Sequence, residues 1–180
     1  VVYENIYYLK DFQDIPITNF EQCLLPQIEK DSTNSRLTFE LVKIYLKNQQ
    51  KIDFAEQLIN NSIRSLLNLP ADQWSLGFVE LDLSEAYKLL AEIKYNKKDY
   101  LSALLAINSS ISTISGNSFE GDILPESKLL RAKIYQKLDN NNLAIKEYAL
   151  LDLKGDTIAI DSLKSIHQLI TNKPENFDTF

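Results

Sequence analysis

The chain has 180 residues, of which 44% are hydrophobic and 24% are charged, and this is the composition of an ordered globular protein. Its formal net charge of -6 opposes nucleic acid and anionic membranes as main partners. The sequence also lacks the apolar run of about 18 residues that membrane insertion requires. With 4 Gly and 5 Pro, the sequence has too few turn residues for a β-sandwich or barrel and favours long helices.

The N-terminal part of the chain has the pattern of short helices. Apolar side chains at near-helical spacing predict a helix over residues 1–12, and Pro16 ends it. In the following helix, Thr18 and Glu21 have the spacing of a capping box. Pro26 removes one internal hydrogen bond, so we expect a bend or an interruption there.

Antiparallel helix hairpins are predicted after the polar connection at residues 31–34. Their helices cover residues 37–48, 53–67, 74–97, 101–114, 125–138 and 143–151. Asp53 and Asp99 are the expected N-terminal caps. Residues 117–124 read as the longest loop, and Pro125 suits the first turn of the helix that follows. Because the turns between paired helices are short, the partners should lie antiparallel.

The C-terminal part ends the predicted domain. Gly155 and Asp156 precede a last helix over residues 158–169. We expect one helical-repeat domain over residues 1–172 and a frayed tail over residues 173–180. The sequence contains no Met, so we expect a piece of a longer protein or a processed form.

The three hairpins share a small residue early in their second helix. This residue is Ala55, Ala103 or Ala144. A small side chain suits a level where two helices approach closely, because a larger one would push them apart. The step between the last two alanines is about 40 residues against about 34 for an ideal tetratricopeptide repeat, and the predicted loop accounts for the excess.

The segment from Leu90 to Leu104 resembles the tetratricopeptide signature. Leu90 and Ala91 stand at the paired leucine and small positions, Asp99 and Tyr100 at the turn, and Ala103 at the family's small position. The resemblance implies an all-α, right-handed solenoid of about three stacked hairpins with flanking helices.

The other two hairpins resemble the signature less closely. Arg131 replaces the family's leucine and Asn141 its aromatic turn residue, and the first hairpin needs one inserted residue near Gln50. Diverged helical repeats of other families give a similar pattern, so the stacked-hairpin architecture is the firmer prediction.

A binding surface follows only from the resemblance. The family presents its first helices on a concave groove, and the matching positions here are Lys88, Glu92, Tyr95 and Asn96. Glu92 stands where chaperone-binding members have an asparagine, which disfavours binding of chaperone tails. A peptide with some basic character would suit the acidic chain better.

The sequence offers little for catalysis or metal binding. His167 is the only histidine, so a catalytic triad would have to use it, and we interpret it as a structural histidine. One histidine and one cysteine, Cys23, cannot form a zinc cluster. Cys23 is interpreted as a small core residue, and recurring tyrosines as packing residues. We expect no catalytic residue, no metal and no cofactor.

These observations favour a non-catalytic scaffold or adaptor that binds a peptide or partner protein within a larger assembly. The single cysteine fits a cytoplasmic location. The alternative is a periplasmic or cell-envelope domain that captures a glycan or peptide. An enzyme is the least favoured class, and the oligomeric state is not predicted.

Overall fold

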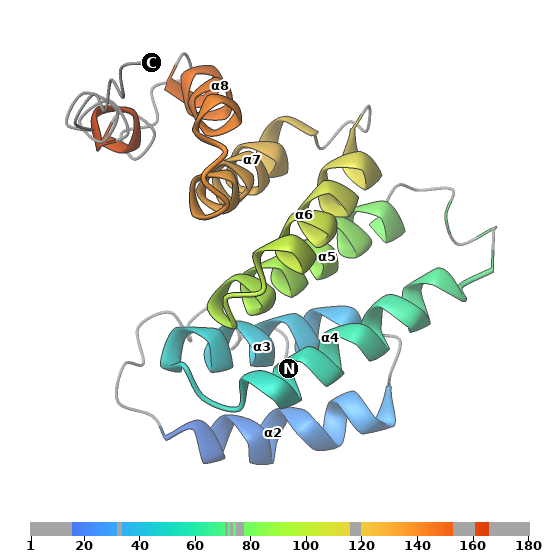
Figure 1. Cartoon of the computed structure of the whole chain (residues 1–180). Helices are drawn as coiled ribbons and strands as arrows, with labels where there is room; N and C mark the ends of the chain where they lie inside the picture. The colour runs from blue at the N-terminus through green and yellow to red at the C-terminus, as the bar shows by residue number, and fades with distance from the viewer. Residues whose placement is uncertain are drawn as a thin grey trace, which may run out of the picture. The chain divides into compact units, whose positions relative to one another are not determined.

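The computed structural model describes residues 16–31, 34–70, 72, 74, 78–115, 120–152 and 161–165. Within these residues the regular elements are all helices, which pack in chain order as adjacent antiparallel pairs (Figure 1). This confirms the predicted all-α architecture of helix hairpins. Among the described residues, no helix combines the length and the apolar character needed to cross a membrane.

The chain divides into two compact units, Val1–Leu69 and Pro70–Phe180. The prediction of one repeat domain over residues 1–172 stays a prediction. The predicted helix at residues 1–12, His167 and the tail at 173–180 lie outside the described residues. Residues 161–165 are helical, within the range predicted for the last helix.

The first unit is built around one central helix. Its described helices are α2 (Ile17–Lys30), α3 (Ser35–Asn48) and α4 (Ile52–Leu67). The middle helix, α3, packs against both of the others. It can do so because apolar residues cover two of its sides, and Leu41, Val42 and Tyr45 are fully buried.

The capping box predicted for α2 is wrong. The helix begins at Ile17, one residue before Thr18, and its start at Pro16 has no side-chain cap. Glu21 does not reach back to the helix start. It accepts a hydrogen bond of 2.7 Å from the Tyr45 hydroxyl of α3, so tertiary contact outweighs the local capping signal.

Two further sequence predictions for this unit need correction, and the bend expected at Pro26 stays a prediction. The helix α2 continues through Pro26 without interruption. Asp53 lies in the first turn of α4, and the cap position is Lys51. Cys23 is exposed and not a core residue, because its neighbour Leu24 occupies the buried side of the helix.

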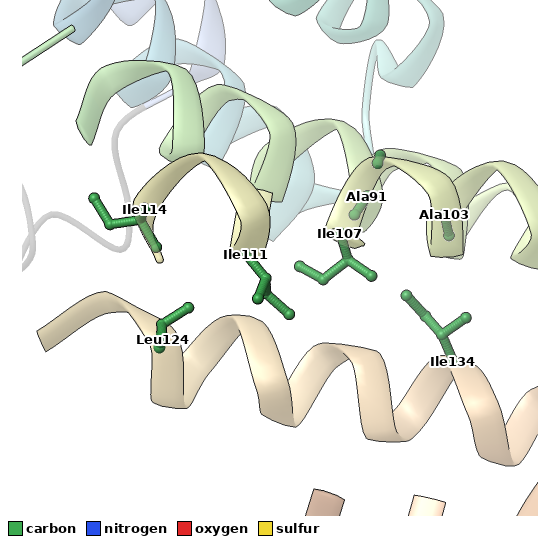
Figure 2. Close-up of a cluster of buried hydrophobic side chains, with 8 residues drawn as sticks. Ala91, Ala103, Ile107, Ile111, Ile114, Leu124 and Ile134 are labelled. Atoms are coloured by element: carbon green, nitrogen blue, oxygen red, sulfur yellow. The ribbon is translucent and has the colours of Figure 1, made fainter. Parts of the chain in front are cut away.

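The second unit contains two hairpins that share a core. Its helices are α5 (Phe78–Asn96), α6 (Tyr100–Ile114), α7 (Glu120–Lys137) and α8 (Asn141–Asp152). Each helix packs on the next, and α5 also contacts α7. Figure 2 shows isoleucines of α6 pointing toward Leu124 and Ile134 of α7, which together form the core between these helices.

One helix start differs from the prediction. The helix expected from Trp74 is α5, which the structure describes from Phe78 onward. The predicted loop at residues 117–124 is helical from Glu120 onward, so Pro125 lies inside α7 and not in its first turn. The reason is Leu124, which is buried against α6, so this stretch gains more from core packing than it loses at Pro125.

The three hairpins close with the same turn. In each, one residue has a left-handed backbone: Gln49 (φ 53°), Lys98 (φ 63°) and Asp139 (φ 56°). The N–H of the following residue donates to the carbonyl five residues back: Gln50 to Tyr45 (3.1 Å), Asp99 to Lys94 (2.9 Å) and Asn140 to Tyr135 (2.9 Å). These bonds define a Schellman motif, which satisfies carbonyls at the end of the first helix.

The alanines found in the sequence occupy one common position after these turns. The N–H groups of Ala55, Ala103 and Ala144 each donate to the carbonyl four residues back, in the first turn of the second helix. All three side chains are 0% exposed. The structure thus confirms a small buried residue at the same level of each hairpin.

The inserted residue predicted near Gln50 is also confirmed. Asp99 and Asn140 immediately follow the left-handed residue and directly precede the next helix. In the first hairpin, Gln50 takes the place after Gln49, and Lys51 adds a second left-handed conformation (φ 50°) before α4 begins.

Candidate functional site

The four binding residues predicted from the resemblance all lie on α5. Lys88, Glu92, Tyr95 and Asn96 are spaced at i, i+4, i+7 and i+8, which places them on one side of the helix. Their exposure differs. Lys88 is only 8% exposed, Glu92 and Tyr95 are half-buried, and Asn96 is exposed.

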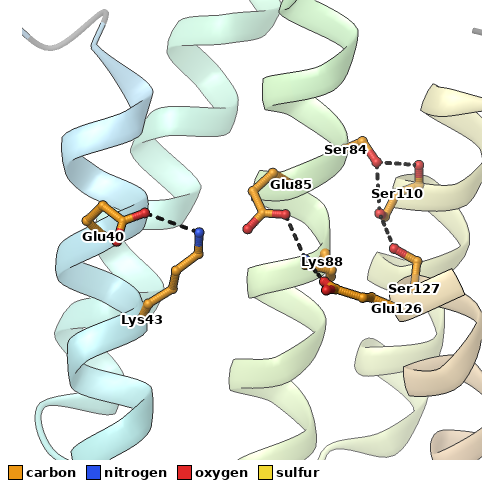
Figure 3. Close-up of polar contacts among 8 residues, drawn as sticks. All are labelled: Glu40, Lys43, Ser84, Glu85, Lys88, Ser110, Glu126 and Ser127. Carbon is orange, nitrogen blue, oxygen red and sulfur yellow. Dashed lines mark hydrogen bonds and ion pairs between the residues drawn. The ribbon is translucent and has the colours of Figure 1, made fainter. Parts of the chain in front are cut away.

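Lys88 joins α5 to α7. Its ammonium lies 2.8 Å from a carboxylate oxygen of Glu85 on the same helix and 2.8 Å from one of Glu126 on α7 (Figure 3). Burial alone would lower the pKa of Lys88, but the charges and hydrogen bonds of the two glutamates raise it to about 12. The lysine charge is therefore engaged within the unit.

Three serines meet beside this ion pair, one from each of three helices. The Ser84 hydroxyl donates to the Ser110 carbonyl at 2.9 Å, and the hydroxyls of Ser110 and Ser127 lie 3.3 Å apart (Figure 3). All three side chains are fully buried. Small hydroxyls let α5, α6 and α7 approach closely while their own polar groups stay hydrogen-bonded.

Sequence reasoning missed this serine junction. The only local signal is Ser110, a polar residue on the otherwise apolar face of α6. Its partners are 26 and 17 residues away, so their meeting depends on helix packing that no local pattern reveals.

Tyr95 packs within the hairpin. Its ring meets Tyr100 of α6 edge to face, with ring centroids 5.5 Å apart and an interplanar angle of 62°. Burial, with a smaller contribution from Tyr100, raises the pKa of Tyr95. The ring also packs against the buried cluster of α5, α6 and α7. This fits the interpretation of the recurring tyrosines as packing residues.

Arg131, the residue that departs from the signature, connects three helices. Its guanidinium donates to the Asn108 side chain of α6 at 3.1 Å and pairs with Glu147 of α8. The Nε of Arg131 and one oxygen of Glu147 are buried without a hydrogen-bond partner in the structure. An arginine at the leucine position is thus accommodated by polar partners on both neighbours.

In the first unit, Glu21 is the centre of a comparable polar contact. Besides the bond from Tyr45, it forms an ion pair of 2.6 Å with Lys51 in the α3–α4 turn. Hydrogen bonds from Lys51 and Tyr45 hold the pKa of Glu21 below its ordinary value. This contact ties α2 to the turn.

Lys88 and Arg131 thus join neighbouring helices through polar contacts. Within the described residues, no group of three or more His, Cys, Asp or Glu side chains is placed to hold a metal ion. Of the predicted binding residues, Asn96 is exposed and Glu92 is half-buried. No protein-family model and no curated protein matches the chain.

Proposed function

We propose that the chain is a tetratricopeptide-like helical-repeat module that acts as a non-catalytic scaffold, binding a peptide or partner protein within a larger assembly. The observation that carries this proposal is the recurrence of one turn with one buried alanine in all three hairpins. Repeated hairpins of this kind form a right-handed stack in that family.

A second observation supports stacking of hairpins within the second unit. Besides its own partner α6, α5 contacts α7, the first helix of the next hairpin. The Lys88–Glu126 ion pair and the serine junction lie at this contact. In a stack of hairpins, first helices line one side, so the exposed side of α5 is the proposed binding surface.

The proposed surface is centred on Asn96 and Glu92. Lys88 is bound to two glutamates and Tyr95 packs on Tyr100, so substitutions there would disturb the hairpin as well as a bound ligand. Asn96 is exposed at the end of α5, where an added side chain would block a ligand without entering the core.

Selection of a phage-displayed library of random peptides on the whole chain tests the proposal. Peptides that bind are then measured by isothermal titration calorimetry against the wild type and an Asn96→Arg variant. We expect Asn96→Arg to weaken binding at least about tenfold, because a bulky charge would occupy the ligand's place.

The matched control is Asn142→Arg, which places the same side chain on the exposed face of a second helix, α8. We expect it to bind selected peptides like the wild type. Recovery of no specific peptide would contradict the scaffold function, and equal affinity of wild type and Asn96→Arg would contradict the assigned surface.

A further inference from the structure

The helix α6 is unusual in carrying no charge. Its sequence from Tyr100 to Ile114 contains no Asp, Glu, Lys or Arg, although 24% of the chain is charged. Among the described helices from α2 to α8, it is the only one with this property. Surface helices ordinarily carry charged side chains on their solvent face, so this face needs an explanation.

In the first half of α6, both the side that faces the core and the opposite side are apolar. One side packs into the core and consists of Ala103, Ala106, Ile107, Ser110, Ile111 and Ile114, several of which are visible in Figure 2. On the opposite side, Leu101 is 68% exposed and Leu105 is 72% exposed. They lie one turn apart and are followed by the exposed, uncharged Asn108 and Ser112.

The other hairpins show that the turn and packing do not require these leucines. Leu101 and Leu105 lie two residues before and after the buried Ala103. The equivalent residues around Ala55 of α4 are Asp53 and Gln57, and those around Ala144 of α8 are Asn142 and Lys146. All four are exposed. The leucine pair is therefore a property of the α6 surface and not of the hairpin.

We propose that the Leu101–Leu105 face binds the same face of a second copy of this chain. A leucine pair is complementary to itself, as a twofold interface between identical subunits requires. The chain carries a net charge of -6, so most pairs of surfaces would bring like charges together, whereas α6 itself contributes no charged side chain.

The orientation of the two copies follows from the same face. If two α6 helices cross antiparallel at the level of Ala103, four leucines meet at the centre. Lys98, which precedes one helix, then lies opposite Asn108 of the other, whose side chain accepts a hydrogen bond from Arg131, and not opposite a second lysine. So small an apolar contact gives a weak dimer, with a Kd on the order of 0.1 mM. The interface goes beyond the proposed peptide binding and uses a different helix.

Sedimentation velocity of the whole chain from about 10 μM to about 1 mM tests this interface, because the range spans the expected Kd. We expect the mass of the wild type to rise from 20.7 kDa toward twice that value. A Leu101→Asn/Leu105→Lys variant should stay monomeric. Its new side chains are those that α8 carries at the equivalent positions, so the hairpin should retain its fold.

The matched control is Leu150→Lys, which removes a different exposed leucine, 55% exposed, from α8. It should associate like the wild type. In the unmodified chain, ¹⁵N-labelled spectra over the same concentrations should show shifts at amides of Ser102, Leu105 and Asn108, and this readout needs no variant.

Three results would overturn the inference. They are a wild type that remains monomeric at the highest concentration, equal loss of association in the Leu150→Lys control, and concentration-dependent shifts away from α6. A monomeric chain whose leucine pair binds a different protein would also overturn it. Peptide binding at α5 is measured separately, so its outcome does not decide this test.

Discussion

The α3–α4 and α5–α6 hairpins reach the same packing through turns of different length. In α5–α6, Asp99 both follows the left-handed residue and caps α6, accepting a hydrogen bond of 3.2 Å from the Ser102 N–H. In α3–α4 an extra residue stands between the left-handed Gln49 and the cap position of α4. That position is Lys51, which provides no side-chain cap.

The difference shows which part of the hairpin is constant. The longer turn is accommodated by a second left-handed residue and by the ion pair of Lys51 with Glu21. The buried alanine stays at the same position of the following helix in both hairpins. The close approach of the two helices is therefore retained while the turn varies.

The largest expected effect comes from enlarging the alanine. Ala103→Leu should lower the free energy of unfolding by about 3 kcal/mol, because the site is fully buried at a close helix contact and has no room for three more carbons. Urea unfolding followed by circular dichroism measures the change.

The control for this substitution is Ala149→Leu, at an exposed position of α8. It should change the free energy of unfolding by less than about 0.5 kcal/mol. If Ala103→Leu were as stable as Ala149→Leu, close packing at the alanine would not be what the hairpins share.

The next effect concerns the contact that anchors the longer turn. Glu21→Gln should cost about 1–2 kcal/mol at pH 7, because it weakens the hydrogen bond from Tyr45 and removes the ion pair with Lys51. The pKa of Glu21 is lowered by folding, so its contribution is present above the ordinary value of 4.5 and is lost as pH falls through the folded-state pKa.

Urea unfolding at several pH values between 7 and about 3 therefore should show the wild type and Glu21→Gln converging on acidification. The matched control is Glu40→Gln, which removes an exposed carboxylate paired with Lys43 on α3. It should cost less than about 0.5 kcal/mol. A constant difference between wild type and Glu21→Gln across this range would contradict the lowered pKa.

The smallest effect distinguishes the two left-handed positions. Lys98→Gly should stabilise the chain by about 0.5–1 kcal/mol, because glycine adopts a positive φ without the steric cost of a Cβ atom. Lys51→Gly should give no net gain, since relief at the backbone is offset by loss of the partner of Glu21.

Urea unfolding measures both glycine variants, with Lys97→Gly as the control for a neighbouring residue that has no positive φ. That control should be neutral or destabilising. Destabilisation by Lys98→Gly would show that the backbone there is not left-handed in solution.

The sequence was sufficient to predict the hairpins because their signals are local. Apolar spacing places the helices, and Ala55, Ala103 and Ala144 mark the repeated level. The start of α7 was missed because Pro125 suits a first helical turn and residues 117–124 read as a loop, whereas burial of Leu124 is decided by its contact with α6.

The candidate site was harder to predict because its contacts join residues distant in sequence. Lys88 was expected on a binding face, but its partner Glu126 is 38 residues away and engages its charge between two helices. The same reason explains Glu21, whose partner Lys51 is 30 residues away. Neither pairing follows from helical periodicity, which reports only neighbours on one helix.

The recurrence of one turn in three hairpins is tested most directly by NMR of the isotopically labelled chain. Backbone couplings and chemical shifts give φ at Gln49, Lys98 and Asp139. Couplings across hydrogen bonds show whether the amide of the next residue donates to the carbonyl five residues before it. We predict positive φ at all three residues and the bonds to Tyr45, Lys94 and Tyr135. A negative φ at any of the three residues, or a missing bond, would contradict the repeat.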